Sequence, residues 1–216
     1  KPNLELIKEV FHQSMIRGKH ATGLSYVKDN KIKTIKNGVP VTEFFKTINL
    51  SECINEDGSL YLIGHIRYST SDIRYNQPFS NGNISICHNG VISQEDPSEW
   101  SYKCQTSNDS EMILKSIEHN NHPLEDFADK SMSVCSISSD KTLSCFRNHE
   151  RPLWYSLLSN GIIFTSTKDI AIRSGLNSPK KCDMFVEYKY KHSLTETKIV
   201  YNNYLKDLQW YSIKIN

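Results

Sequence analysis

The sequence predicts an α+β fold in which two packed β-sheets are flanked by helices. The 216 residues contain about ten segments of strand length and three or four of helical period, and the helices are grouped rather than alternating one for one with the strands. Two runs, 60–66 and 84–88, are almost continuously apolar, which is typical of strands buried on both faces. Because this length suits one large domain, we expect residues 1–216 to form a single domain.

The first predicted element is an amphipathic helix. Its apolar positions recur at three- and four-residue spacing, at Leu4, Ile7, Phe11 and Met15. Asn3 can cap its start, and the cation and glycine of Arg17-Gly18 favour its end. A hairpin should follow, with a strand at 22–27, a turn at Asp29-Asn30 and a returning strand, and a short helix is expected around Phe44-Phe45.

The remaining elements follow in order along the chain. After the apolar strands 60–66 and 84–88, the dipeptide Asn89-Gly90 indicates a turn, and 107–111 reads as a helix start. The later strands are predicted at 132–137, 143–146, 155–158, 162–165, 184–190, 198–201 and 209–215. One more short helix is expected around 169–174.

Composition and charge exclude several classes of protein. The net charge is +2, from 26 basic and 24 acidic scattered residues, so the charge pattern does not favour nucleic-acid binding. No apolar run approaches the roughly 18 residues of a membrane span, and the first residues do not read as a secretory signal. The six cysteines show no C-x-x-C spacing, so we expect reduced thiols in the cytoplasm, no metal and no cofactor. Cys87, Cys135 and Cys145 lie in apolar alternation, typical of small buried side chains.

Three polar features carry possible chemistry, and each also has an ordinary structural interpretation. Arg67 follows an apolar strand, so its guanidinium could bind a carboxylate through bidentate hydrogen bonds, or it could be an ordinary surface arginine. Asn89-Gly90 is either a hairpin turn or an oxyanion hole made of a side-chain amide and a backbone N–H. Asp109 either caps a helix or holds a ligand ammonium group.

Taken in order, the motifs resemble those of the class II glutamine amidotransferases, the N-terminal-nucleophile (Ntn) group. The matching segments are 17–23 (RGKHATG), 64–70 (GHIRYST), 76–79 (NQPF), 88–92 (HNGVI) and 107–111 (SNDSE), with weaker matches at 151–153 (RPL) and 165–169 (TSTKD). The stretch 76–79 is one residue shorter than the family spacing, and Ser71 stands where many relatives carry another residue.

The resemblance implies a four-layer α-β-β-α sandwich of two antiparallel sheets and hydrolysis of the side-chain amide of glutamine. By position, Arg67 and Thr70 would hold the α-carboxylate of glutamine, and Asp109 its ammonium group. Asn89 and Gly90 would form the oxyanion hole, and Tyr68 and His88 would line the pocket. Arg17 and Asn76 would support the structure around the active site. The ammonia released would pass to a separate synthetase or acceptor protein.

One departure from the family pattern bears on catalysis. The family's nucleophile is a leading Cys followed by Gly, on a central strand, and its base is the free α-amino group; this sequence opens with Lys1 and a helix. We expect a strand and loop of about 10–20 residues to be missing from the sequence, or another segment to take its place.

Three functional hypotheses therefore stand. The first is a glutaminase or amidotransferase whose N-terminal Cys lies upstream of Lys1; a related Ntn amidase or peptidase is a variant of it. The second is a nucleophile-less relative that binds glutamine or a partner without turnover. The third is an interaction protein that reuses the fold, for example one encoded by a phage, since Asn, Lys and Ser are abundant as in AT-rich genomes.

Overall fold

The computed structural model describes residues 1–68, 76–149, 151–201 and 208–214. Helix α1 (Leu4–Gln13) begins where expected, because the Asn3 side chain accepts a hydrogen bond of 3.0 Å from the Leu6 N–H. A 3₁₀ turn, η1 (Ser14–Arg17), extends it to Gly18. The predicted cap and stop signals of this helix are both confirmed.

A first antiparallel sheet of three strands has the order β2-β1-β3. It consists of β1 (Ala21–Lys28), β2 (Lys31–Asn37) and β3 (Leu62–Arg67). Asp29 and Asn30, with φ of 53° and 56°, form the two-residue turn between β1 and β2, as the sequence predicts. Helix α2 (Val41–Thr47) and the 3₁₀ helix η2 (Leu50–Cys53) follow β2 and pack with α1 on one face of this sheet.

A second sheet of three strands has the order β10-β8-β9. Its members are β8 (Trp154–Leu158), β9 (Gly161–Thr165) and β10 (Lys180–Lys181), and helix α5 (Lys168–Arg173) follows β9. The third sheet has seven antiparallel strands in the order β13-β12-β11-β7-β6-β5-β4. They are β4 (Phe79–Ser80), β5 (Ile84–Val91), β6 (Ser131–Ser138), β7 (Thr142–Arg147), β11 (Val186–Tyr190), β12 (Leu194–Tyr201) and β13 (Leu208–Lys214).

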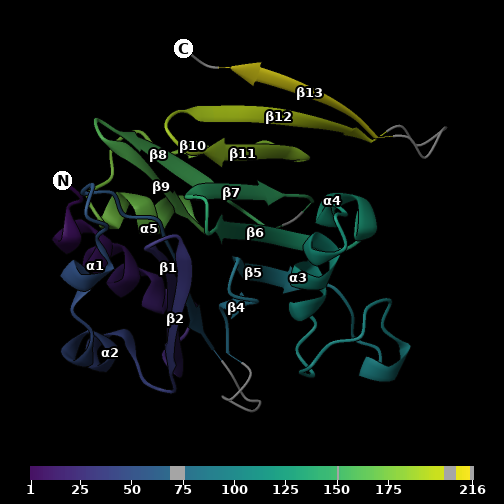
Figure 1. Ribbon diagram of the computed structural model, residues 1–216, viewed down its shortest axis with the longest axis horizontal. Helices are drawn as coiled ribbons and strands as arrows, with labels where there is room; N and C mark the ends of the chain where they lie inside the picture. Colours follow the sequence, from purple (N-terminus) through teal and green to yellow (C-terminus); the bar gives the residue numbers. More distant parts are fainter. Residues whose placement is uncertain (69–75, 150, 202–207, 215–216) are drawn as a thin grey trace.

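Side chains alternate between the two faces of the seven-stranded sheet, and each face packs against a different layer. Ile86, Val134 and Phe146 point to one face, where helices α3 (Glu111–Glu118) and α4 (Pro123–Asp126) and the 3₁₀ turn η4 (Pro97–Glu99) follow β5 in sequence. Cys87 and Cys145, one residue out of phase, point to the other face and pack with the two smaller sheets. Figure 1 shows α1, α2 and α5 on the opposite side of the molecule from α3 and α4. The predicted α-β-β-α sandwich is confirmed.

The layer made by the two smaller sheets is divided. Within the described residues, β3 pairs only with β1 and β9 pairs only with β8, so each strand leaves one edge without a partner strand. Consecutive residues of both strands, 62–67 and 162–165, line the same cavity. The strand predicted at 60–66 forms as 62–67 and is buried on both faces, because Ile63 packs with Cys87 on one side and Ile66 packs with Phe11 on the other. Gly64 is exposed at the open edge.

Among the described residues, one predicted turn is absent and the other predicted elements are present. Asn89-Gly90 is not a hairpin turn, because β5 continues through it to Val91 and pairs with β6 along its whole length. The other predicted strands and helices all form, with boundaries shifted by up to about four residues. In the described parts of the chain, no helix has the length and apolar character needed to cross a bilayer.

Candidate functional site

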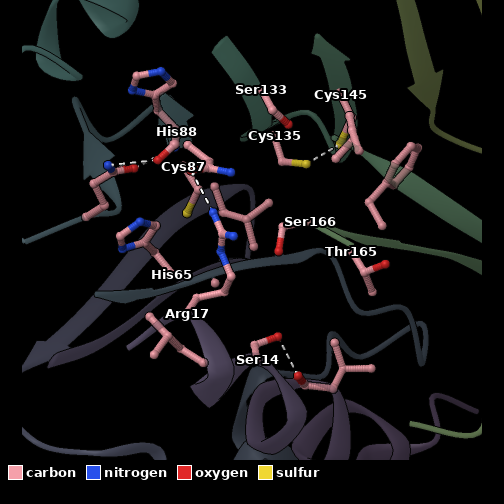
Figure 2. Close-up of a pocket in the computed structure, with 18 of the residues that line it drawn as sticks. Ser14, Arg17, His65, Cys87, His88, Ser133, Cys135, Cys145, Thr165 and Ser166 are labelled. Atoms are coloured by element: carbon pink, nitrogen blue, oxygen red, sulfur yellow. Dashed lines mark hydrogen bonds between the residues drawn. The ribbon is translucent and has the colours of Figure 1, made fainter. Parts of the chain in front are cut away.

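Side chains from seven elements, α1, η1, β3, β5, β6, β7 and β9, converge on one cavity of about 520 Å³. It lies between the edges of β3 and β9, with β5, β6 and β7 as its floor and α1 at its side, as Figure 2 shows. The predicted site residues Arg17, Arg67, Tyr68, His88, Asn89, Gly90 and Asp109 all contribute to its lining. Groups that are far apart in the sequence are therefore close enough to contact one small molecule.

Asn89 reaches the cavity because it shares a strand face with Cys87, whereas His88 between them points toward α3. The Arg17 Nη2 donates to Asn89 Oδ1 at 3.1 Å. Since this contact occupies the amide oxygen, it directs the amide nitrogen, Nδ2, the other way. That nitrogen is buried and has no hydrogen-bond partner among the described residues, so it is available to donate to a ligand.

Gly90 is the position in the site where a side chain cannot be accommodated. Its φ is +154°, and a Cβ built there would lie 2.0 Å from the Ser131 backbone oxygen and 2.6 Å from His88 Nε2. The absence of a side chain brings the backbone at Gly90 close to both β6 and the His88 ring. The Asn89-Gly90 pair thus combines an oriented amide with a closely packed backbone unit.

Gln77 holds this corner in place, and the sequence interpretation assigned it no role. Its Oε1 accepts from the His88 backbone N–H at 2.5 Å, and its Nε2 donates to the His88 backbone oxygen at 3.0 Å. Its Nε2 also donates to Ser110 Oγ at 3.1 Å, and that hydroxyl contacts His88 Nδ1 at 2.8 Å. The Gln77 amide therefore continues the pairing with β5 on the N-terminal side of β4, before that strand begins. The NQPF motif was the signal that marked this segment.

Arg67 lies at the end of β3, with its side chain half-buried. Its Nη1 donates to Asn76 Oδ1 at 3.3 Å, so Asn76 holds the side chain of the predicted carboxylate-binding residue. Tyr68 is 73% exposed and contacts the His20 ring at 4.9 Å between centroids, which places it at the rim rather than deep in the cavity. Thr70, the other predicted carboxylate ligand, lies outside the described residues.

Asp109 does not cap helix α3, whose N-cap residue is Ser110. Its Oδ2 instead accepts from the backbone N–H groups of Ile92 at 2.6 Å and Ser93 at 3.2 Å, which fixes the chain just after β5. Asp109 is also close enough to Arg67 to affect its titration: partial burial lowers the pKa of Arg67, and the Asp109 charge acts in the opposite direction. One cation and one anion thus face the same cavity.

The histidines of the site are kept neutral by their surroundings. Burial, with His65 and Arg151 nearby, lowers the pKa of His88 to about 3. Burial, together with the charges of Arg67 and Arg17, lowers the pKa of His65 to about 4. Neither ring is suited to accept a proton near pH 7.

Two of the cysteines that line the cavity, Cys87 and Cys145, are also poorly suited to be nucleophiles for the glutamine amide. Burial raises the pKa of both Cys87 and Cys145 well above the usual range of a thiol. A thiol with a raised pKa carries little thiolate near neutral pH. Across the described ranges, no group of three or more His, Cys, Asp or Glu side chains could hold a metal ion.

Comparison with known proteins shows that this chain is similar in structure to solved proteins. No protein-family model matches the sequence, and no curated protein matches it significantly. One similar solved structure is glutamine phosphoribosylpyrophosphate (PRPP) amidotransferase from B. subtilis, complexed with ADP and GMP. It superposes with a TM-score of 0.71 at 16% identity, over 97% of this chain and 46% of that chain.

A second similar structure is that of the allosteric regulatory enzyme of purine biosynthesis. Its TM-score is 0.71 at 17% identity, over 87% of this chain and 44% of that chain. This chain therefore spans less than half the length of either structure. At these identities the likeness establishes the fold alone, and it confirms the predicted α-β-β-α architecture.

Proposed function

We propose that this chain forms the glutamine-hydrolysing domain of an amidotransferase, which releases ammonia from the side-chain amide of glutamine. The observation that carries the proposal is the grouping of Arg67, Asp109 and the Asn89-Gly90 corner around one cavity. A guanidinium and a carboxylate suit the two charged ends of an amino acid. The Asn89-Gly90 corner then faces the side-chain amide of the bound glutamine.

In the proposed mechanism, Arg67, together with Thr70, binds the α-carboxylate of glutamine, and Asp109 binds its ammonium group. Asn89 Nδ2, oriented by Arg17, and the Gly90 N–H donate to the oxygen that becomes negative when the amide is attacked. Preorganised donors of this kind contribute about 3 kcal/mol each to transition-state stabilisation. Tyr68 covers the rim of the site, and His88 supports the corner from below.

The nucleophile in this proposal is an N-terminal Cys on a strand that fills the gap between β3 and β9. The Lys1 backbone oxygen accepts from Asn160 Nδ2 at 2.9 Å, which places Lys1 at the start of β9. A segment joined to Lys1 and entering the gap would run antiparallel to both β3 and β9. Its leading residue would then lie at the Arg67 and Thr165 end, where Asn89 is located.

The chemistry balances as hydrolysis. The thiolate attacks the amide carbon, and the α-amino group takes up the thiol proton and returns it to the departing ammonia. Water then cleaves the γ-glutamyl thioester to glutamate and restores the thiol. The sum is glutamine and water to glutamate and ammonia, and we propose that a separate acceptor protein or synthetase uses the ammonia.

The test compares the 216-residue chain with a chain extended by its own upstream residues and processed to a free N-terminal Cys. We expect the extended chain to release glutamate from glutamine, and a diazoketone analogue of glutamine to label that Cys. Arg67→Ala and Asp109→Asn should raise the KM for glutamine at least tenfold, whereas Arg173→Ala, at an exposed arginine of α5, should not. An extended chain with a free leading Cys and neither product nor label would contradict the proposal.

A second candidate function is glutamine binding without turnover. It is favoured by the buried thiols of the cavity, whose raised pKa makes them weak nucleophiles. Calorimetry of the 216-residue chain distinguishes the two functions. Glutamine binding that is lost in Arg67→Ala, with no hydrolysis by the extended chain, would support this second function.

A further inference from the structure

Three cysteines stand in one row across the floor of the cavity. Cys87 of β5 is opposite Cys135 of β6, and Cys135 is opposite Cys145 of β7. All three point to the same face of the seven-stranded sheet, and all three line the cavity. Figure 2 shows the three cysteines above Arg17 and Ser166 in the view, with the contact between Cys135 and Cys145 marked. The proposed glutamine chemistry uses none of these thiols.

The Cys135–Cys145 pair has the geometry that a disulfide requires. The two sulfurs lie 2.7 Å apart, against about 2.05 Å in an S–S bond. Opposite residues of an antiparallel pair have Cα atoms about 4.5–5.5 Å apart, and disulfides span about 4.4–6.8 Å between Cα atoms. The spacing of opposite residues in this register therefore falls within the range that a disulfide spans.

We propose that Cys135 and Cys145 are a modification site, at which exchange with a low-molecular-weight disulfide joins β6 to β7 across the cavity floor. The reagent has access because both residues line a cavity of about 520 Å³. Cys135 is partly exposed there, whereas Cys145 is completely buried. The difference in exposure sets the order of the two reaction steps.

In the first step, the Cys135 thiolate attacks one sulfur of the small disulfide, breaks its S–S bond and releases one small thiolate. In the second step, Cys145 passes its proton to that thiolate, attacks the Cys135 sulfur and expels the other small thiol. Two protein thiols are oxidised to one disulfide, and one small disulfide is reduced to two thiols. Burial raises the pKa of Cys145, so little of it is thiolate, but in the second step its target sulfur is already in contact with it.

The test uses the folded 216-residue chain and oxidised glutathione, followed by alkylation and mass spectrometry without reduction. We expect the chain to lose two of its six alkylatable thiols. Trypsin cleaves after Lys141, between the two cysteines, so the product should appear as peptides 131–141 and 142–147 joined by a disulfide. This readout does not depend on glutamine hydrolysis or on any variant folding correctly.

Matched variants make the result specific. Cys135→Ser should leave Cys145 alkylatable after oxidation, and Cys87→Ser should leave the 131–141/142–147 link unchanged. A link through Cys87, or a mixed disulfide that stops at Cys135, would contradict the proposal. So would six free thiols in the folded chain under conditions that oxidise the urea-unfolded chain.

Discussion

Replacing Gln77 with Ala tests whether the corner of the site depends on one side-chain amide. The substitution removes both contacts that the amide makes to the backbone of His88, at 2.5 Å and 3.0 Å, and a third to Ser110. His88 is 3% exposed and Gln77 is 6% exposed, so the released groups lie in the interior. Strand β4 pairs with β5 only at Ile86 and Ser85, and so offers no replacement.

The expected cost follows from the groups left without partners. A buried polar group that loses its hydrogen bond costs about 1–3 kcal/mol, and two backbone groups of His88 are affected. Water from the adjoining cavity can reach part of this space, so we take the lower half of that range. Gln77→Ala should therefore lower the free energy of unfolding by about 2–4 kcal/mol. That is a large fraction of the roughly 5–15 kcal/mol that stabilises a typical protein.

Urea denaturation followed by circular dichroism measures this cost. The midpoint should fall while the m-value stays constant, because the native fold and the surface exposed on unfolding are retained. Gln94→Ala, at an exposed glutamine, is the matched control and should change the free energy by no more than about 0.5 kcal/mol. If Gln77→Ala costs no more than this control, the bridging role assigned to Gln77 is wrong.

Three other outcomes are expected. Gly90→Ala should cost at least about 2 kcal/mol in a thermal melt, because its Cβ would lie 2.0 Å from the Ser131 oxygen, whereas Gly161→Ala, with nothing within 4 Å, should be nearly neutral. The pKa of His88 is about 3 in the folded chain and ordinary in the unfolded chain, so acid protonates the unfolded chain first. The free energy of unfolding should therefore be at its full value above about pH 6.5 and decline as the pH falls toward 5, which urea midpoints would measure. Glu187→Ala should destabilise the chain by about 2 kcal/mol in urea, since it removes a 4% exposed carboxylate paired with a lysine at 3.1 Å.

Each of these outcomes has a result that contradicts it. A Gly90→Ala chain that melts at the wild-type temperature would mean that β6 can move aside. A ring proton of His88 that titrates near pH 6.5 by NMR would remove the reason for the acid instability. An unchanged urea midpoint for Glu187→Ala would show that the buried carboxylate contributes nothing net to stability.

Local sequence signals predicted most of the secondary structure. Asn3 and Gly18 mark the two ends of the first helical segment, and Asp29-Asn30 marks the first hairpin turn. These signals depend on backbone conformation and nearest neighbours, which a sequence contains directly. The prediction of a turn at Asn89-Gly90 was wrong, because pairing with β6 over the whole of β5 outweighs the local preference.

The candidate site residues came from ordered motifs rather than from periodicity. Those motifs identified Arg67, Asn89 and Asp109, but they could not indicate that the Arg17 guanidinium orients the Asn89 amide. Nor could they show that Gln77 pairs with the backbone of His88. Contacts between residues so far apart depend on how the layers pack, and the sequence does not state that packing.

The amino-acid order by itself therefore determined the strands, the helices and the chemical types at the cavity, because these follow from short-range preferences and side-chain identity. Only the tertiary structure decided that β3 and β9 face one another with open edges, and that Cys135 and Cys145 touch below them. The physical reason is that sheet order and strand register are set by long-range burial. Residues at opposite ends of the chain must pack together before a shared cavity exists.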